Sequence, residues 1–479
     1  MGLLIKNGTI ISATSEYVAD ILVDDEIIQK VGLNLPEEEH DVVDATGKYV
    51  FPGGVDEHVH MGPFDSKSFE TSHAALVGGT TTIVDFAPQF PGMTLVESMK
   101  KHAEENAQGV AACDYSFHTM VMDTDPELLM RSIPELADNG IANLKFFMAY
   151  KGSPFYANDA LILRGMFEAK KHGITLMLHA ENSDMIEVLA EFYKERGCID
   201  PIGHSLSRPP IVEDEATFRG IQLAKLADVP LMIVHVTTKG AMRHIKQARE
   251  EGYSIYGETC AHYLTLDESN FLKPNFEGAK YVCAPALRTK DHLDALWDAV
   301  DQGYLKAISS DNAAVIGGFE AKKKGKDDFT KIPNGCPSMQ NRMYMIWTQG
   351  VEKNRITRQK FVEVMCTNPA KISGLYPKKG AILPGSDADI VIFNPHNKGT
   401  IRWENSFEGS DYSPFEGIDR IGICEKVFLR GKLVAQDGNF VGKMGYGNYV
   451  PQKAYALPYE RYLPREDDEN TAIVLDSRT

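Results

Sequence analysis

The central part of the chain, residues 53–370, repeats one local pattern eight times. Short apolar runs rich in β-branched residues, such as "TTTIVDFA", "ITLMLHA" and "PLMIVHVTT", alternate with segments whose apolar residues recur at spacings of three and four. The first kind of run is typical of a buried strand, and the second of an amphipathic helix that packs on it. Strands that alternate with helices form a parallel sheet, and eight such units predict a closed (β/α)8 barrel of the TIM type over residues 53–372.

An open, doubly wound sheet that binds a dinucleotide is the alternative reading of this alternation. That fold requires a Gly-rich turn that follows the first strand and opens a helix. The candidate, "GGTTT" from Gly78, comes before its strand and opens no helix. The barrel is therefore the preferred prediction.

The two ends of the chain have a different sequence pattern. Residues 1–52 and 373–442 consist of short β-like runs separated by turn dipeptides, as in "LLIKNGTII" and "ADIVIFNP". Neither segment is long enough to enclose a core, so we expect one small β-sandwich domain built from both ends of the chain. Residues 443–479 are rich in Tyr and Pro, which predicts an extended C-terminal arm.

Composition narrows the class of partner. The chain carries 67 acidic and 50 basic residues, a net charge of −17, which argues against a nucleic-acid or anionic-membrane partner. No apolar run approaches the ~20 residues of a membrane span. The seven cysteines are scattered and show no C-x-x-C motif, a pattern that favours reduced thiols and a cytoplasmic location.

Polar side chains interrupt the apolar runs where the predicted strands end, which is where the chemistry of a (β/α)8 barrel takes place. His58 and His60, two residues apart, share one face of the first strand and can reach one ion. Imidazole and carboxylate groups suit zinc, so a metal site is expected. The predicted metal ligands are His58, His60, Lys145, His179, His235 and Asp311.

Lys145 is unusual in this set because it stands inside the apolar run "NLKFFMAY". Burial beside two divalent cations disfavours the protonated ammonium. A neutral amine can add carbon dioxide to form a carbamate, an anion whose two oxygens can bridge two metal ions. We therefore hypothesise that Lys145 is carboxylated.

Nine stretches spread along the chain, including "YVFPGGVDEHVH", "LKFFMAYKG", "HSLSRPP", "ETCAHYL" and "DYSPFEG", closely resemble the dihydropyrimidinase/hydantoinase family of cyclic amidohydrolases. The resemblance implies two Zn²⁺ ions per subunit, bridged by carboxylated Lys145 and a hydroxide. One ion is then held by His58, His60 and Asp311, and the other by His179 and His235. It also implies a homotetramer.

The resemblance further implies hydrolytic opening of a cyclic amide or imide. The bridging hydroxide attacks the ring carbonyl, Asp311 transfers a proton to the departing nitrogen, and the Tyr150 hydroxyl stabilises the oxyanion. Ala284 and Asn334 are expected to bind the amide edge of the substrate through their backbone. The ring substituent is placed by conjecture against Met61, Pro63 and Phe64.

Five positions depart from the family pattern: Asn312, Ala313, Ala284, Gln340 and Asn341. All are expected to line or adjoin the pocket, so substrate choice is the feature that they affect. Among related activities, dihydroorotase is disfavoured because Gly62 replaces the arginine that holds a substrate carboxylate. An allantoinase-like activity stays open.

Two hypotheses from other functional classes also stay open. Some relatives of this family are non-catalytic scaffold proteins that have lost the metal ligands, whereas this chain keeps all six. Thiol chemistry through Cys260 and His262 in "ETCAHYL" requires these side chains to form a nucleophile–base pair.

Overall fold

The eight parallel strands of the barrel follow one another in chain order. A computed structural model of the protein describes residues 2–62 and 68–462. The strands are β6 (Gly54–Val59), β7 (Thr80–Pro88), β8 (Asp114–Met120), β9 (Asn143–Phe147), β10 (Thr175–His179), β11 (Leu231–Ile233), β12 (Ile255–Cys260) and β13 (Leu305–Ser309). A parallel bridge between Val59 and Asn312 joins the first strand to the residues after the last. The predicted barrel is confirmed.

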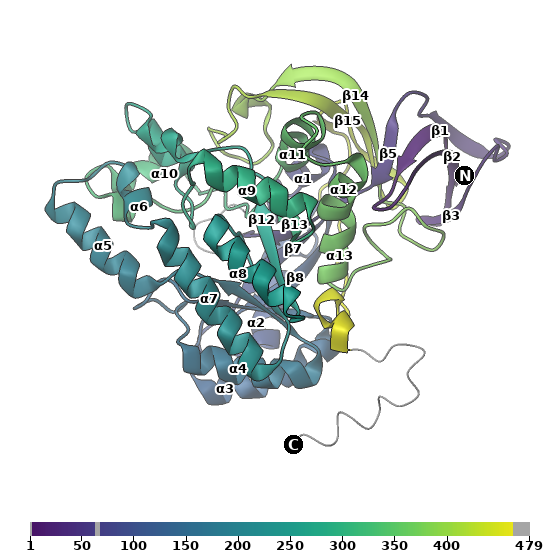
Figure 1. Cartoon of the computed structure of the whole chain (residues 1–479). Coiled ribbons are helices and arrows are strands. Elements are labelled where there is room, and N and C mark those ends of the chain that lie inside the picture. The colour runs from purple at the N-terminus through teal and green to yellow at the C-terminus, as the bar shows by residue number, and fades with distance from the viewer. Residues whose placement is uncertain (1, 63–67, 463–479) are drawn as a thin grey trace.

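Helices surround the barrel, as Figure 1 shows. Their bounds are α1 (His73–Val77), α2 (Leu95–His102), α3 (Pro126–Ser132), α4 (Asp159–His172), α5 (Ser183–Glu195), α6 (Ile202–Leu206), α7 (Pro210–Ala227), α8 (Lys239–Glu250), α9 (Lys290–Asp301), α10 (Gly318–Lys322), α11 (Arg342–Ile346), α12 (Arg358–Val362) and α13 (Asn368–Ile372). Local sequence explains several starts: Thr94 and Glu97 form a capping box at α2, and Thr238 caps α8. In the described part of the chain, no helix combines the length and apolar character needed to cross a bilayer.

A second sheet contains strands from both ends of the chain. They are β1 (Gly2–Ile11), β2 (Glu16–Asp24), β3 (Ile27–Gly32), β4 (His40–Asp44), β5 (Tyr49–Pro52), β14 (Ile390–Thr400), β15 (Asp419–Leu429), β16 (Lys432–Gln436) and β17 (Asn439–Phe440). β5 pairs with β14, which joins the two ends beside the barrel (Figure 1). The sheet is mixed, because β4 and β5 run parallel to β1.

This sheet has its own core. Ile28 from β3 and Phe428 from β15 belong to one buried cluster with Ile10, Ile21 and Ile390, although their strands lie far apart in the sheet order. The sheet therefore folds over a shared apolar core, as the expected sandwich would. Burial of these side chains supplies the hydrophobic free energy that neither end of the chain could supply alone.

Buried charges connect the small sheet to the barrel. The Lys379 ammonium lies 2.6 Å from Asp114, the first residue of β8, and 2.8 Å from Asp389, which precedes β14. Arg430, at the end of β15, also pairs with Asp114. Each buried charge has an opposite partner, so the network fixes how the two parts of the fold meet.

The C-terminal segment through residue 462 runs along the N-terminal ends of the barrel strands. The Val450 amide donates to the Tyr115 carbonyl at 2.8 Å, and the Tyr459 hydroxyl donates to the Ile174 carbonyl at 2.8 Å. Tyr115 and Ile174 lie at the starts of β8 and β10. The segment thus covers one end of the barrel and leaves the C-terminal ends of the strands to the site. The rest of the predicted arm, residues 463–479, lies outside the described residues.

Candidate metal centre

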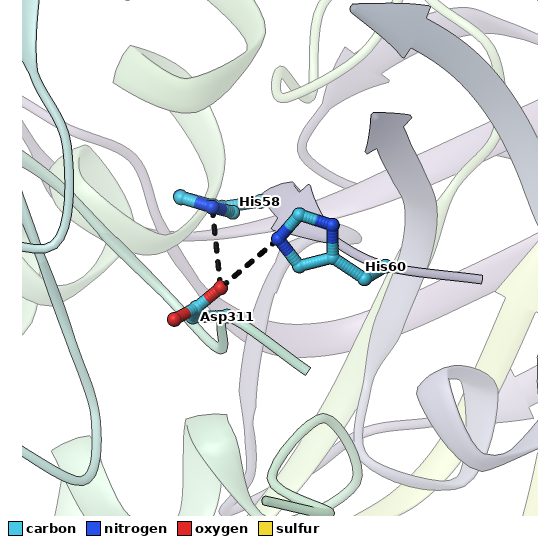
Figure 2. Close-up of side chains that lie close together, drawn as sticks. All are labelled: His58, His60 and Asp311. Atoms are coloured by element: carbon cyan, nitrogen blue, oxygen red, sulfur yellow. Dashed lines mark ion pairs between the residues drawn. The ribbon is translucent and has the colours of Figure 1, made fainter. Parts of the chain in front are cut away.

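Two histidines and one aspartate converge where β6 and β13 end. The Asp311 Oδ1 atom lies 3.2 Å from Nε2 of His58 and 3.3 Å from Nε2 of His60, as Figure 2 shows. Potential ligand atoms of the three residues all lie within 4.8 Å of one another. Side chains that are 250 residues apart in sequence meet here because β6 and β13 are neighbours across the closure of the barrel.

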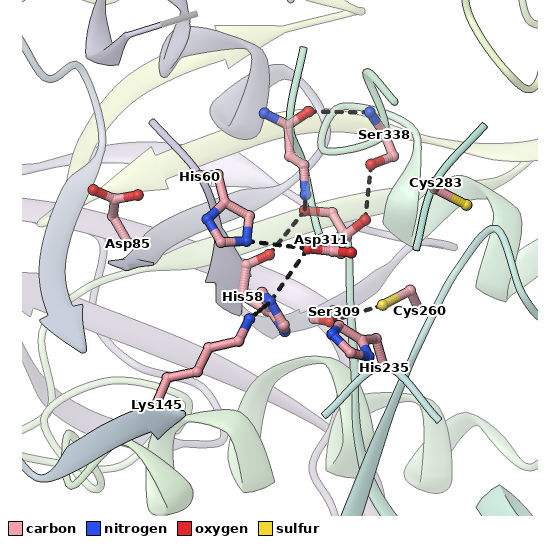
Figure 3. A network of polar contacts seen from close by, with 12 residues as sticks. His58, His60, Asp85, Lys145, His235, Cys260, Cys283, Ser309, Asp311 and Ser338 are labelled. Atoms are coloured by element: carbon pink, nitrogen blue, oxygen red, sulfur yellow. Dashed lines mark hydrogen bonds and ion pairs between the residues drawn. The ribbon is translucent and has the colours of Figure 1, made fainter. Parts of the chain in front are cut away.

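Lys145 enters the same space from β9. Its Nζ atom lies 2.9 Å from Nε2 of His58, a contact drawn in Figure 3. The same atom lies within 5 Å of the ring centres of Phe86 and Phe147. The hydrogen-bond contact of this buried ammonium is with an imidazole rather than a carboxylate. Burial lowers the pKa of Lys145 to about 8, which keeps a substantial fraction of the amine neutral near pH 8.

His235 and His179 complete the convergence. The His235 ring centre lies 5.4 Å from that of His58 and 4.5 Å from that of His179. All six predicted ligands therefore lie at one end of the barrel, in one connected group. Burial lowers the pKa values of His58, His179 and His235, so these imidazoles are neutral, which is the form that binds metal.

Two glutamates orient these imidazoles, and neither was singled out from the sequence. A Glu258 carboxyl oxygen lies 3.0 Å from Nδ1 of His58, which leaves Nε2 facing Asp311. A Glu181 oxygen lies 2.8 Å from Nε2 of His179, which leaves Nδ1 for the centre. Carboxyl groups in this position set the ring orientation of metal-binding histidines. The available signal was an acidic residue inside or just after an apolar run, as in "YSIYGETC" and "HAEN".

Three residues at the site have an uncommon backbone conformation. Tyr150, His235 and Asp311 have φ angles of +65°, +40° and +46°. The left-handed region is unfavourable for side chains of this size and is retained where the surroundings impose it, commonly at functional sites. Here the conformation occurs just after β9, β11 and β13, where the chain turns from a strand into a loop.

A cavity of about 280 Å³ opens beside the centre. Tyr150, Ala284 and Asn334, the predicted substrate-binding residues, all line it. Burial raises the pKa of the Tyr150 hydroxyl, which keeps it protonated and able to donate a hydrogen bond. The remaining lining residues are His60, Lys145, Phe147, Phe155, His179, His235, Cys283, Asp311, Ala313, Pro333 and Gly335.

The departures from the family pattern fall into two groups. Ala284 and Ala313 line the cavity, and the Asn312 carbonyl accepts a hydrogen bond from the His60 amide at 2.8 Å. Gln340 and Asn341 line a different cavity, beside Tyr344 and Arg402, so their expected place at the pocket was wrong. Both residues lie just before helix α11, which begins at Arg342. Of the residues conjectured to contact the ring substituent, Pro63 and Phe64 lie outside the described residues.

The structure does not support thiol catalysis by Cys260 and His262. The Cys260 thiol contacts Ser309 at 3.4 Å and Glu258 at 3.8 Å, and no contact joins it to His262 in the described residues. Burial raises the pKa of Cys260 well above its usual value, which disfavours the nucleophilic thiolate.

The donor set fits metal ions on its own chemistry. Burial opposes ionisation of Asp311, but its contacts with His58 and His60 hold its pKa well below the usual value. The Nδ1 atom of His235 is buried without a hydrogen-bond partner in the described structure. Neutral imidazoles beside an ionised carboxylate match the preferences of Zn²⁺. The fold and site define the class: a (β/α)8-barrel enzyme with a metal-binding donor set at the C-terminal ends of its strands.

Comparison with known proteins gives the family. Residues 49–434 match the amidohydrolase family. A D-hydantoinase of Geobacillus stearothermophilus is 44% identical over 94% of this chain and 97% of its own. A dihydropyrimidinase of Arabidopsis thaliana is 36% identical over 96% of this chain and 87% of its own. The crystal structure of a dihydropyrimidinase from Brevibacillus agri superposes with a TM-score of 0.92 at 41% identity, covering 95% and 100% of the two chains. The chain belongs to the amidohydrolase family.

Proposed function

We propose that this protein is a zinc-dependent hydrolase that opens 5,6-dihydropyrimidine and hydantoin rings to N-carbamoyl amino acids. The observation that carries the proposal is the convergence of His58, His60, Lys145, His179, His235 and Asp311 beside one cavity. Near full-length relatives named D-hydantoinase and dihydropyrimidinase support the same substrate class.

The metal ions are assigned to two groups of ligands. His58, His60 and Asp311 would hold one zinc ion, His179 and His235 would hold the other, and carboxylated Lys145 would bridge them. The lowered pKa of Lys145, about 8, supports carboxylation because only the neutral amine adds carbon dioxide. Zinc bound here lowers the pKa of water and polarises a carbonyl group.

Residues of the chain are assigned the proton transfers and the orientation of the substrate. Asp311, ionised and in contact with the imidazoles of His58 and His60, accepts the proton of the attacking water and delivers it to the departing ring nitrogen. The Tyr150 hydroxyl, whose pKa is raised, donates to the carbonyl oxygen as charge develops there. Backbone groups at Ala284 and Asn334 hold the amide edge of the ring. Phe147 and Phe155 give the cavity an apolar wall.

The test is turnover of dihydrouracil, hydantoin, 5-substituted hydantoins and allantoin by zinc-loaded enzyme. We expect hydrolysis of the first three and little hydrolysis of allantoin. A preference for allantoin would support the allantoinase-like alternative instead. A folded protein that binds no zinc and opens none of these rings would support the scaffold alternative.

A homotetramer is part of the proposal, and helix α5 supports a subunit contact. Ser183 is its only buried residue in the described chain, although one side of the helix is apolar. Val188 is 66% exposed, and Ile211 on neighbouring α7 is 60% exposed. Apolar patches of this kind commonly mark protein–protein contacts. Light scattering on wild type and Val188→Asp tests this: a tetramer that the substitution disrupts supports the contact.

We also propose a cytoplasmic location. All seven cysteines are free, and six of them are buried. Unpaired thiols persist in reducing compartments and are uncommon in secreted proteins. Fractionation of cells that express the protein would test the proposal, and recovery outside the cytoplasm would contradict it.

A further inference from the structure

The barrel closes between β6 and β13 without a ladder of backbone hydrogen bonds, in the part of the chain that the structure describes. These strands are the two ends of the strand order, and one isolated bridge, between Val59 and Asn312, connects them. At this bridge the His60 amide donates to the Asn312 carbonyl at 2.8 Å. We call the boundary between β6 and β13 the seam. Further polar contacts across the seam involve side chains.

A buried arginine spans the seam. The Nη1 atom of Arg342, from α11, donates to the Val55 carbonyl at 3.1 Å and to the Ile308 carbonyl at 2.8 Å. Val55 belongs to β6 and Ile308 to β13, so one group binds the backbones of both strands. The Nη2 atom donates to the Thr80 hydroxyl at 3.0 Å, and the side chain is fully buried. Because a guanidinium is planar and its donors point in fixed directions, it sets the distance between the groups that it binds.

A buried aspartate makes a second connection across the seam. The Asp56 Oδ1 atom, from β6, accepts a hydrogen bond from the Ser310 amide at 3.0 Å. Its Oδ2 atom lies 3.5 Å from Nε of Arg342. The Ser310 hydroxyl donates in turn to the His58 carbonyl at 3.4 Å. Asp56, Ser310 and Arg342 thus form one connected group that joins β6 to the residues that follow β13.

This group has the same offset from the proposed zinc ligands on both sides of the seam. Val55 stands three residues before His58, and Ile308 stands three residues before Asp311. At about 3.3 Å per residue along a strand, the guanidinium contacts lie roughly 10 Å from the ligands. The short distances from Asp311 to the imidazoles of His58 and His60 cross the seam (Figure 2). They therefore depend on how far apart the two strands are held.

We propose that Arg342 is a positioning residue for the metal centre. By fixing the separation of β6 and β13, its guanidinium sets the distance between Asp311 and the imidazoles of His58 and His60. Zinc binds nitrogen and oxygen ligands within a narrow range of about 2.0–2.2 Å, so a change in this spacing lowers metal affinity. This role of Arg342 deepens the proposed function and rests on the metal centre assigned there.

The two proposed metal ions differ in their relation to the seam. The ligands of the first ion, among them His58 and Asp311, come from both sides of it. The second ion is assigned to His179, which ends β10, and His235, which follows β11. Neither of these strands borders the seam. A change at Arg342 should therefore weaken binding of the first ion more than binding of the second.

The experiment measures zinc affinity in wild type and Arg342→Lys by competition with a chelator. Lysine keeps the buried positive charge, but its ammonium lacks the planar fork of donors that spans both carbonyls. We expect binding of one of the two ions to weaken by roughly tenfold or more, the usual effect of losing a group that supports metal ligands. Replacement of zinc by cobalt gives a second measurement, because the visible spectrum of cobalt reports its ligand geometry. We expect that spectrum to change in Arg342→Lys.

Tyr344→Phe is the matched control. Tyr344 lies on the same helix as Arg342, and its buried hydroxyl donates to the Val77 carbonyl of α1 at 2.9 Å rather than to β6 or β13. This variant also loses a buried hydrogen bond between α11 and the barrel. It should nevertheless keep the zinc affinity and cobalt spectrum of wild type.

Three results would overturn the proposed role of Arg342. The first is wild-type zinc affinity with an unchanged cobalt spectrum in folded Arg342→Lys. The second is an equal loss of affinity in Arg342→Lys and Tyr344→Phe, and the third is equal weakening of both ions. If Arg342→Lys does not fold, as judged by circular dichroism, Arg342→Gln takes its place. Zinc binding is measured without substrate, so a protein that binds both ions and opens no ring would refute the proposed function alone.

Discussion

The Lys145 ammonium nitrogen lies 2.9 Å from Nε2 of His58, whose other ring nitrogen contacts Glu258. A buried cation held against an imidazole gains little from its neighbour and loses its hydration. Conversion of the amine to a carbamate would replace this buried cation with an anion suited to two cations. The burial of Lys145 therefore supports the proposed carbamate.

Lys145→Ala is expected to abolish nearly all ring-opening activity, because no other group in the site can supply the bridging carboxylate. Short carboxylic acids such as acetate should restore part of the activity. Lys145→Arg should stay inactive, since a guanidinium keeps its proton and cannot add carbon dioxide. Lys151→Ala, which removes an exposed lysine paired with Asp184, is the matched control. Full activity in Lys145→Ala would refute the carbamate.

Tyr150→Phe should lower kcat by roughly a hundred- to a thousandfold, the usual cost of one oxyanion donor. The zinc content of the variant should match that of wild type, because Tyr150 is outside the proposed ligand set. Steady-state kinetics and elemental analysis make the measurement, with Tyr156→Phe as the control. A change confined to KM would mean that the hydroxyl only binds the substrate.

Glu181→Gln should weaken zinc binding by roughly 10- to 100-fold, because the amide orients His179 less firmly than the carboxylate does. Competition with a chelator measures the affinity. Glu168→Gln offers a matched comparison, since Glu168 contacts His172 at 3.3 Å on the outside of the barrel. Equal zinc affinities for the two variants would remove Glu181 from the metal site.

Removal of the metal should abolish activity and lower the temperature of unfolding. The metal binds the folded chain, so its loss removes the stabilisation that binding provides. Zinc should restore both properties, and we expect about two ions per chain from the family pattern. Elemental analysis and thermal unfolding are the measurements. Active protein with fewer than one transition-metal ion per chain would contradict the proposed function.

The pH dependence of stability should reveal the buried carboxyl group of Glu408, which accepts hydrogen bonds from the Met339 and Gln340 amides. Burial raises its pKa from 4.5 to about 7. Its contribution to stability is therefore fully present below pH 4.5 and is lost as the pH rises through 7, by up to about 3 kcal/mol. Glu408→Gln cannot ionise, so it avoids the cost of a buried carboxylate. Its urea midpoint should therefore exceed that of wild type above pH 7. A difference between the two proteins that does not vary with pH would contradict this prediction.

The barrel and the six proposed ligands were predictable because both depend on local patterns. A parallel strand buried on both faces appears as an apolar run, and its C-terminal end marks where functional side chains lie. His58, His179 and His235 each interrupt or end such a run. The barrel topology alone then brings these residues together, because all its parallel strands end on the same rim.

The positions of Gln340 and Asn341 were mispredicted for a related reason. They were expected at the pocket as departures from the family pattern, but they lie just before α11 and line another cavity. Loop paths have no periodicity that a sequence pattern could show. The contacts of Glu258 with His58 and of Glu181 with His179 could not be predicted either. They depend on the direction in which each side chain points at the rim of the barrel.

The sequence by itself determined the class of fold and the chemical identity of the donor set, because period and residue type are properties of short segments. Only the tertiary structure decided that Nε2 of His58 and of His60 faces Asp311, and that Glu258 contacts the other ring nitrogen of His58. These contacts join residues 200 or more positions apart. They exist only after burial and strand pairing have placed the loops, which is a property of the packed chain as a whole.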